Sequence, residues 1–117
     1  MLALHYIEND APFPPVHEAL DDPNGLLAFG GDLSPQRLFS AYSQGISPWF
    51  SDDEPLLWWS PDPRAIICLD DFCVSKSLKK LVRQRKYTVT LNHAFERVID
   101  TCSAIPRVTQ SGSGVSN

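Results

Sequence analysis

The chain reads PNGLLAFGGDLSPQRLFSAYSQGISPWFSDDEPLLWWSPDPR from Pro23 to Arg64, and this stretch decides the fold of its first half. All three tryptophans fall within eleven positions of it, from Trp49 to Trp59, among turn-forming prolines. Tryptophan supplies a large rigid surface with a polar edge, and proline fixes the backbone around it. Such a cluster is typical either of a packed corner of a core or of a platform on which a base stacks.

A short helix is predicted over residues 34–44 of this stretch. Ser34 can cap the first turn, and Pro35 suits the first helical position. Asp32 is expected to brace the turn before the helix, and Gly45 is a typical residue just beyond a helix end. The inward face of the helix is expected to carry three side chains: Leu38, Ala41 and Tyr42.

Residues 46–64 are expected to form a proline-punctuated loop that carries the tryptophans. Trp58 and Trp59 are adjacent, so in extended backbone they point to opposite faces. One of them should lie in the core and the other should be partly exposed, and we interpret both as structural. Asp62 and Arg64 are expected to form a local ion pair, although Arg64 could instead reach an RNA phosphate or a carboxylate.

The second half is predicted to alternate strands with helices, and a short strand is expected near residues 4–8. Apolar and β-branched residues favour strands at 65–69 and 87–91. A helix capped by Ser75 is expected between them, and a second helix from Asn92. One face of that second helix carries four apolar side chains: Phe95, Val98, Ile99 and Cys102. This order predicts an α+β fold, with a small N-terminal α+β lobe followed by a strand–helix–strand–helix layer.

The net charge of −4 conceals an uneven distribution along the chain. Residues 1–75 hold twelve acidic and two basic residues, a balance of −10, whereas residues 76–117 hold two acidic and eight basic residues, a balance of +6. Six of the basic residues lie in or directly after the helix predicted after Ser75: Lys76, Lys79, Lys80, Arg83, Arg85 and Lys86. The first four recur at helical spacing and share one face. Such a face is either ordinary solvated surface or a surface for phosphate contact.

The bulk composition suits one small globular domain or part of a larger one. The chain has 117 residues, of which 43% are hydrophobic. Its three cysteines lack metal-ligand spacing, so we expect reduced thiols in a cytoplasmic protein and no bound metal. The N-terminus resembles no signal peptide, and no apolar run approaches the length of a membrane span.

Several blocks of the quoted stretch resemble the leucyl/phenylalanyl-tRNA–protein transferase family. They include GLLA at 25–28, GGDLSP at 30–35, PWF at 48–50 and WWSPDPR at 58–64. Weaker similarity continues to about Cys102. The last block is very specific, because two tryptophans followed by Ser-Pro-Asp-Pro-Arg are improbable by chance. Family members are about twice as long, so the resemblance covers their N-terminal half.

The resemblance implies an enzyme that moves Leu or Phe from aminoacyl-tRNA to the N-terminal Arg or Lys of an acceptor protein, which marks that protein for degradation. It implies no cofactor and, for the full-length protein, a monomer. It implies that Trp49 holds the 3′-terminal adenosine of the tRNA by stacking, whereas the residues alone also allow a core tryptophan. For the basic helix, it favours contact with the tRNA backbone over an ordinary solvated surface.

The domain organisation expected from the resemblance has three parts. Residues 1–62 form the N-terminal lobe, residues 63–104 open an acyltransferase-like (GNAT-type) domain, and residues 105–117 form a divergent, flexible tail. We expect a truncated member of the family that does not transfer amino acids by itself. The alternatives are a non-catalytic tRNA- or RNA-binding fragment, and a small interaction domain whose basic face is merely solvated.

Overall fold

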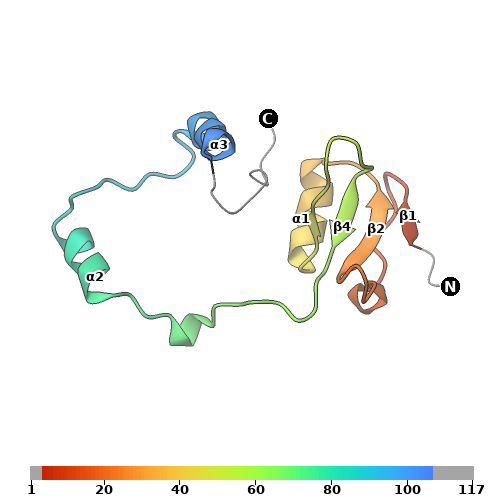
Figure 1. Ribbon diagram of the computed structural model, residues 1–117, viewed down its shortest axis with the longest axis horizontal. Coiled ribbons are helices and arrows are strands. Elements are labelled where there is room, and N and C mark those ends of the chain that lie inside the picture. Colours follow the sequence, from red (N-terminus) through yellow and green to blue (C-terminus); the bar gives the residue numbers. More distant parts are fainter. Residues whose placement is uncertain (1–3, 107–117) are drawn as a thin grey trace. The chain divides into compact units, whose positions relative to one another are not determined.

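The computed structural model describes residues 4–106 of the chain. It contains two compact units, Met1–Ile67 and Cys68–Asn117, which we describe separately. The described elements form a mixed α+β structure with one small sheet and three α-helices (Figure 1). The α+β class expected from the sequence is therefore confirmed.

The first unit is built on a four-stranded sheet in the order β1-β2-β4-β3. Its strands are β1 (His5–Ile7), β2 (Leu26–Gly30), β3 (Ser47–Pro48) and β4 (Leu57–Trp59). β1 runs parallel to β2, whereas β2–β4 and β3–β4 are antiparallel. The strand expected near residues 4–8 is confirmed.

The segment 46–64, expected to be a loop, contains two short strands, β3 and β4, and the residues between them form the loop. β4 pairs with β2 on one side and with β3 on the other. β3 is an edge strand, so Pro48, which has no N–H to donate, is tolerated there. The prolines did not prevent strand pairing because they lie at an edge and outside β4.

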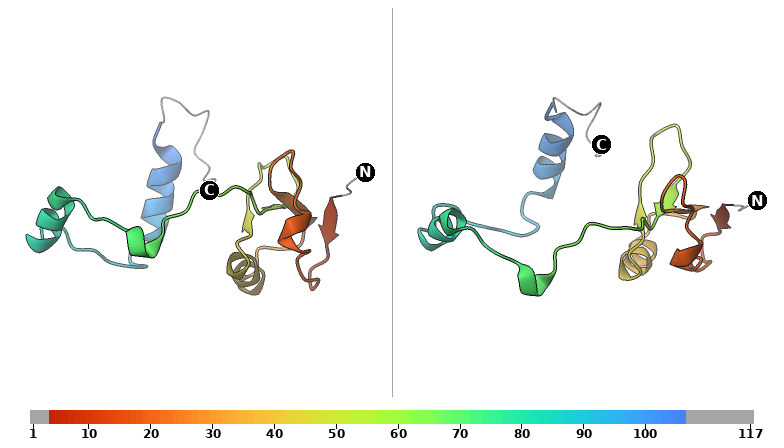
Figure 2. Two further views of the ribbon diagram at one scale, coloured as in Figure 1. Left: turned by 90° about the horizontal axis from the view of Figure 1, so that it is seen from below. Right: turned by 60° about the horizontal axis from the view of Figure 1, so that its bottom comes forward.

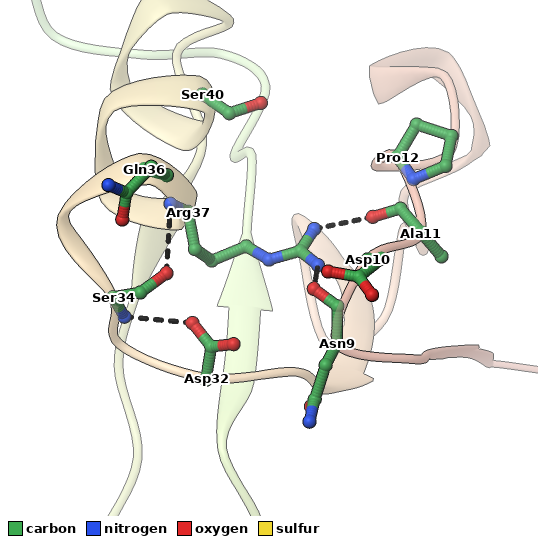
Figure 3. A pocket seen from close by; sticks show the side chains of 9 residues that line it. All are labelled: Asn9, Asp10, Ala11, Pro12, Asp32, Ser34, Gln36, Arg37 and Ser40. Atoms are coloured by element: carbon green, nitrogen blue, oxygen red, sulfur yellow. Dashed lines mark hydrogen bonds between the residues drawn. The ribbon is translucent and has the colours of Figure 1, made fainter.

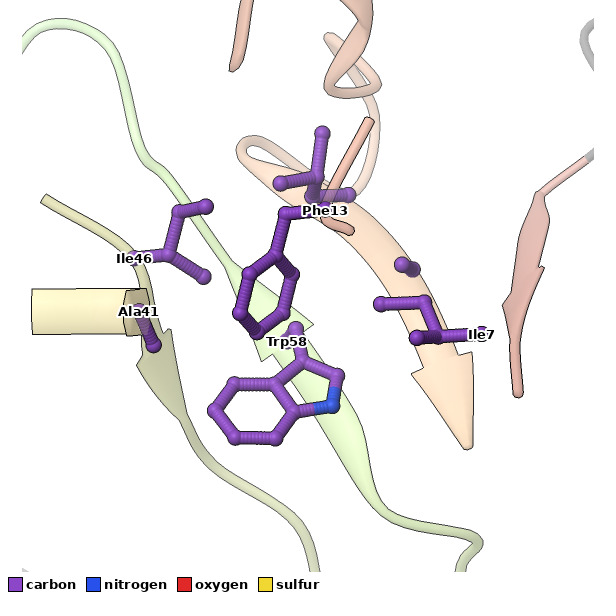
Figure 4. Close-up of a cluster of buried hydrophobic side chains, with 7 residues drawn as sticks. Ile7, Phe13, Ala41, Ile46 and Trp58 are labelled. Carbon is purple, nitrogen blue, oxygen red and sulfur yellow. The ribbon is translucent and has the colours of Figure 1, made fainter. Parts of the chain in front are cut away.

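The core of the first unit gathers around the indole of Trp58, which is fully buried (Figure 4). The Phe13 ring meets it edge-on, with ring centroids 4.9 Å apart. Its Nε1–H donates to the Gly30 carbonyl at 2.9 Å, so the polar edge of the ring is also satisfied. The other buried apolar residues are Ile7, Leu27, Ala28, Ala41 and Ile46.

The predicted first helix is confirmed as α1 (Pro35–Ser43), which contacts β3. It lies to one side of the sheet (Figure 2). The hydroxyl of Ser34 caps it by accepting from the Arg37 N–H at 3.2 Å. Gly45 follows the helix with φ +72°, a left-handed conformation that favours glycine.

The predicted inward face of α1 needs one correction. Ala41 is fully buried and Leu38 packs against the core, as expected, but the Tyr42 side chain is 61% exposed. Arg37, which lies one turn before Ala41, is buried instead. The physical reason is that the backbone carbonyls of Glu8, Asn9 and Ala11 accept hydrogen bonds from both Nη atoms of the guanidinium, although its buried Nε has no partner among the described residues.

The second unit contains η2 (Leu69–Asp71), a single 3-10 turn, and two α-helices, α2 (Lys76–Arg83) and α3 (Phe95–Ala104). The Ser75 cap is confirmed, since its hydroxyl accepts from the Leu78 N–H at 3.2 Å. α3 begins at Phe95, three residues after the expected start.

The strands expected at 65–69 and 87–91 are wrong, because neither segment is extended into a paired strand in the described part of the chain. A strand is stabilised by a hydrogen-bonded neighbour, and no described strand pairs with either segment. Their apolar side chains remain largely exposed: Ile66, Ile67, Leu69, Tyr87, Val89 and Leu91.

Candidate nucleic-acid interface

Trp49 lies directly after β3, and its backbone is held from two sides. Its N–H donates to the Leu57 carbonyl at 3.1 Å. Its own carbonyl accepts from the Trp59 Nε1–H at 2.7 Å. The Trp49 side chain is nevertheless 63% exposed, so it does not pack into the core of the first unit. An exposed indole offers a flat face on which a base can stack.

The two adjacent tryptophans of β4 behave as the sequence predicted. Trp58 is buried and Trp59 is half-buried, on opposite faces of the strand. Phe50 adds a further partly exposed ring beside Trp49 in the sequence. The turn that follows is closed by the Ser51 N–H, which donates to Glu54 Oε2 at 2.9 Å.

The basic face of the second unit is carried by α2. Lys76, Lys79, Lys80 and Arg83 are all exposed and lie on one side of the helix. Arg85 and Lys86 follow directly, and the Lys86 ammonium lies 6.0 Å from the centre of the Tyr87 ring. Among residues 4–106 the ion pair found is His5–Glu18, in the other unit. None of the α2 cations takes part in an ion pair within residues 4–106.

The opposite side of α2 is apolar, with Leu81 half-buried and Leu78 and Val82 exposed. The helix is thus amphipathic, with its charges gathered on one face. Trp49 and α2 belong to different units.

A polar hollow of about 490 Å³ opens at the start of α1 (Figure 3). Arg37, only 7% exposed, spans it and donates to the carbonyls of Ala11 at 2.6 Å, of Glu8 at 3.1 Å and of Asn9. The guanidinium also lies over the Phe13 ring, 5.1 Å from its centre. These bonds tie the chain after β1 to α1, so we interpret Arg37 as a structural clamp.

Asp32 braces the same turn, as the sequence predicted. Its Oδ1 accepts from the Ser34 N–H at 2.8 Å. Hydrogen bonds from Ser34 hold the pKa of this carboxyl below its ordinary value, and the Arg37 charge adds to the effect. A carboxylate so fixed in its ionised form suits a structural role better than proton transfer at neutral pH.

The ion pair expected between Asp62 and Arg64 is wrong, since no such pair forms among the described residues. Arg64 instead donates from Nη2 to the Gly45 carbonyl at 2.7 Å, beyond the end of α1. The backbone of Asp62 is held by Asn24, which donates to the Asp62 carbonyl at 2.6 Å and accepts from its N–H at 3.1 Å.

Three other kinds of feature concern residues 4–106: metal-binding groups, disulfides and membrane-spanning helices. No group of His, Cys, Asp or Glu there is arranged to hold a metal ion, and the cysteines are free thiols. None of the helices in that range is long and apolar enough to cross a membrane. Sequence reasoning missed Arg37, although its position one turn before Ala41 on the inward side of α1 was a usable signal.

The sequence matches two models of known protein families. A family model described as the leucyl/phenylalanyl-tRNA protein transferase N-terminal domain matches residues 31–62. A second model, described as leucyl/phenylalanyl-tRNA protein transferase, matches residues 66–117. Both models describe tRNA–protein transferases, a class of aminoacyltransferases.

Curated relatives agree with the models. A leucyl/phenylalanyl-tRNA–protein transferase of Pseudoalteromonas atlantica is 55% identical over 107 residues, which are 92% of this chain and 46% of the relative. Those of Xanthomonas axonopodis pv. citri and Shewanella halifaxensis are 52% and 50% identical, over 90% and 100% of this chain and 42% and 50% of their own length. The chain belongs to the leucyl/phenylalanyl-tRNA–protein transferase family. It spans about half the length of the curated relatives it matches.

Proposed function

We propose that the protein transfers a leucyl or phenylalanyl group from aminoacyl-tRNA to an acceptor protein in the cytoplasm. The acceptor's N-terminal Arg or Lys supplies an α-amine that attacks the ester carbonyl. The ester bond breaks, the tRNA leaves with a free 3′-terminal hydroxyl, and the amine gives up a proton. The acceptor then carries a new N-terminal residue that directs it to degradation. The family match supports this reaction class.

Within this reaction, the described residues are proposed to hold the tRNA. Trp49 would stack on the 3′-terminal adenosine, and six cations would contact the backbone of the tRNA: Lys76, Lys79, Lys80, Arg83, Arg85 and Lys86. The observation that carries this role is the exposed Trp49 indole on a backbone fixed at both its N–H and its carbonyl. Holding the ester in one orientation lowers the entropic cost of the amine's attack.

We also propose how the chain divides into domains. Residues 1–62 would form the N-terminal lobe, and residues 63–104 would open a GNAT-type, acyltransferase-like domain, of which α2 and α3 are the described helices. The tail at 105–117 lies almost entirely outside the described residues. The pocket for the amino-acid side chain and the proton acceptor are proposed to belong to the acyltransferase-like domain of the whole protein.

The second candidate is a tRNA-binding chain without transferase activity. It is favoured by the exposed basic face of α2, which forms no ion pair within residues 4–106 and needs only phosphates as partners. Transfer of labelled Leu from leucyl-tRNA to a peptide that begins with Arg separates the two candidates. Transfer by the purified chain supports the first and would overturn the expectation that this chain does not transfer amino acids by itself. Binding of tRNA without transfer supports the second as the role of this chain.

The basic face has its own test, which also separates specific RNA contact from a merely solvated surface. Replacing Lys79, Lys80 and Arg83 together by Ala should weaken tRNA binding. It should also flatten the dependence of log affinity on log salt by up to about three ion equivalents, because fewer counterions are released. The affinity is measured between low and moderate salt by fluorescence anisotropy of labelled tRNA.

The matched control for this test is Gln84→Ala at the end of the same helix, which removes no charge. It should keep both the affinity and the salt slope of the original chain. An unchanged salt slope in the triple variant would contradict the phosphate contact and favour an ordinary solvated face.

A further inference from the structure

Each of the two tryptophans of β4 donates its indole N–H to a backbone carbonyl, but the two carbonyls lie in different parts of the first unit. Trp58 Nε1–H donates into the core, to the Gly30 carbonyl at 2.9 Å. Trp59 Nε1–H donates outward, to the Trp49 carbonyl at 2.7 Å. The first bond joins two strands of the sheet, whereas the second holds the residue that directly follows β3.

The backbone around Trp49 has few other anchors. β3 is only two residues long and ends at Pro48, which has no N–H to donate. Beyond it, the Trp49 N–H reaches the Leu57 carbonyl at 3.1 Å. The chain then enters the 51–54 turn, whose backbone bond joins the Glu54 N–H to the Ser51 carbonyl at 3.0 Å. The peptide on the C-terminal side of Trp49 is therefore fixed by the Trp59 indole.

We propose that Trp59 is a positioning residue for Trp49. Its N–H fixes the peptide after Trp49, and this contact orients the exposed Trp49 indole for a terminal base. Trp59 itself touches no reacting atom. The inference rests on the proposed role of Trp49 in stacking on the 3′-terminal adenosine, and it adds the residue that sets the geometry of that stacking.

The test compares Trp59→Phe with Trp58→Phe, which are the same chemical change at neighbouring positions. Each variant keeps an aromatic ring and loses one N–H donor to a backbone carbonyl. The readout is the ratio of the chain's affinities for intact tRNA and for the same tRNA lacking the 3′ adenosine. A merely structural role changes both affinities together and leaves this ratio unmoved.

Trp59→Phe should reduce the ratio by about two- to tenfold, the size expected for losing one neutral hydrogen bond. Binding of the shortened tRNA and the salt slope should stay the same, because stacking releases few counterions. Trp58→Phe should lower the Tm, since its bond lies in the core, and should keep the ratio. Trp49→Ala should remove the preference for the 3′ adenosine, so that the two affinities become equal. This variant sets the largest effect that Trp59→Phe can reach.

A second measurement stays informative if Trp58→Phe fails to fold. The ¹⁵N order parameter of the Trp49 indole N–H should fall in folded Trp59→Phe relative to the original chain. An original chain with no preference for the 3′ adenosine would refute the stacking role and this inference with it. A preference that survives intact in folded Trp59→Phe would refute the positioning role alone.

Discussion

Arg37 shows at the scale of single residues what sequence could and could not supply. The Ser34 cap and the Asp32 brace could be predicted, because both act within three residues of their partners. The burial of Arg37 could not, because its carbonyl partners lie 26 to 29 positions away in the sequence. Local hydrogen bonds can be predicted from sequence, whereas a buried charge depends on tertiary contacts.

The tryptophans show the same limit at the candidate site. Alternation along β4 predicted that Trp58 and Trp59 face opposite ways, but not which of them enters the core. The exposure of Trp49 could not be derived from the residues alone either, since a proline-rich aromatic cluster also suits a packed corner. The structure shows the Trp49 side chain exposed and its backbone hydrogen-bonded to Leu57 and Trp59, which lie eight and ten positions further along the chain.

Asp32 should make the stability of the first unit depend on acid pH. Its folded-state pKa lies below its ordinary value, so its contribution is complete above that value and is lost as the pH falls through the folded-state pKa. Asp32→Ala should therefore lower the Tm at pH 7, and the gap to the original chain should close below about pH 4. Thermal melts followed by tryptophan fluorescence across this range measure the gap. Asp53→Ala, in an exposed turn, should leave the Tm unchanged throughout.

At the scale of elements, helices were predicted better than strands. α1 and α2 carry their caps in their own sequence, and both begin where those caps predicted. A helix closes its hydrogen bonds internally, whereas a strand needs a neighbour from elsewhere in the chain. This difference explains why β-like patterns at 65–69 and 87–91 are not strands in the described residues.

The Ser75 cap should control how much of α2 is helical in the free chain. α2 has eight residues and none is buried, so little tertiary packing supports it. Ser75→Ala removes the bond to the Leu78 N–H and should cost about 1 kcal/mol of helix stability. The ¹³Cα chemical shifts of residues 76–83 should move toward coil values, and tRNA affinity should fall with them.

A neighbouring serine provides the control for this cap. Ser77→Ala removes a hydroxyl that lies 3.1 Å from the Ser75 hydroxyl, but it keeps Ser75 as the acceptor of the Leu78 N–H. It also replaces a serine inside α2 by a better helix former, so helicity should rise slightly. Equal losses of helicity in the two variants would contradict a capping role for Ser75, because they would point to a shared effect of losing a hydroxyl.

At the scale of the whole molecule, buried residues are distributed between the two units as unevenly as charge is. The first unit encloses a core around Trp58, whereas no residue of the second unit is buried within the described range 68–106. The acidic balance lies mainly in the first unit and the basic balance in the second. Composition predicted the division of charge, but the difference in burial required the structure, because both halves contain ample apolar residues.

This difference predicts two levels of stability within one chain. Backbone amides open locally with free energies that follow the apolar burial around them. Amides of β2 and β4 should therefore exchange with deuterium far more slowly than those of α2 and α3, in the tRNA-free chain at neutral pH. Trp58→Ala, which should cost about 3–5 kcal/mol, should remove the protection of the first unit. Exchange in α2 and α3 should not change, since the variant touches no core of theirs. Equal protection of both units in the original chain, or loss of protection in both on replacing Trp58, would show instead that they fold as one cooperative body.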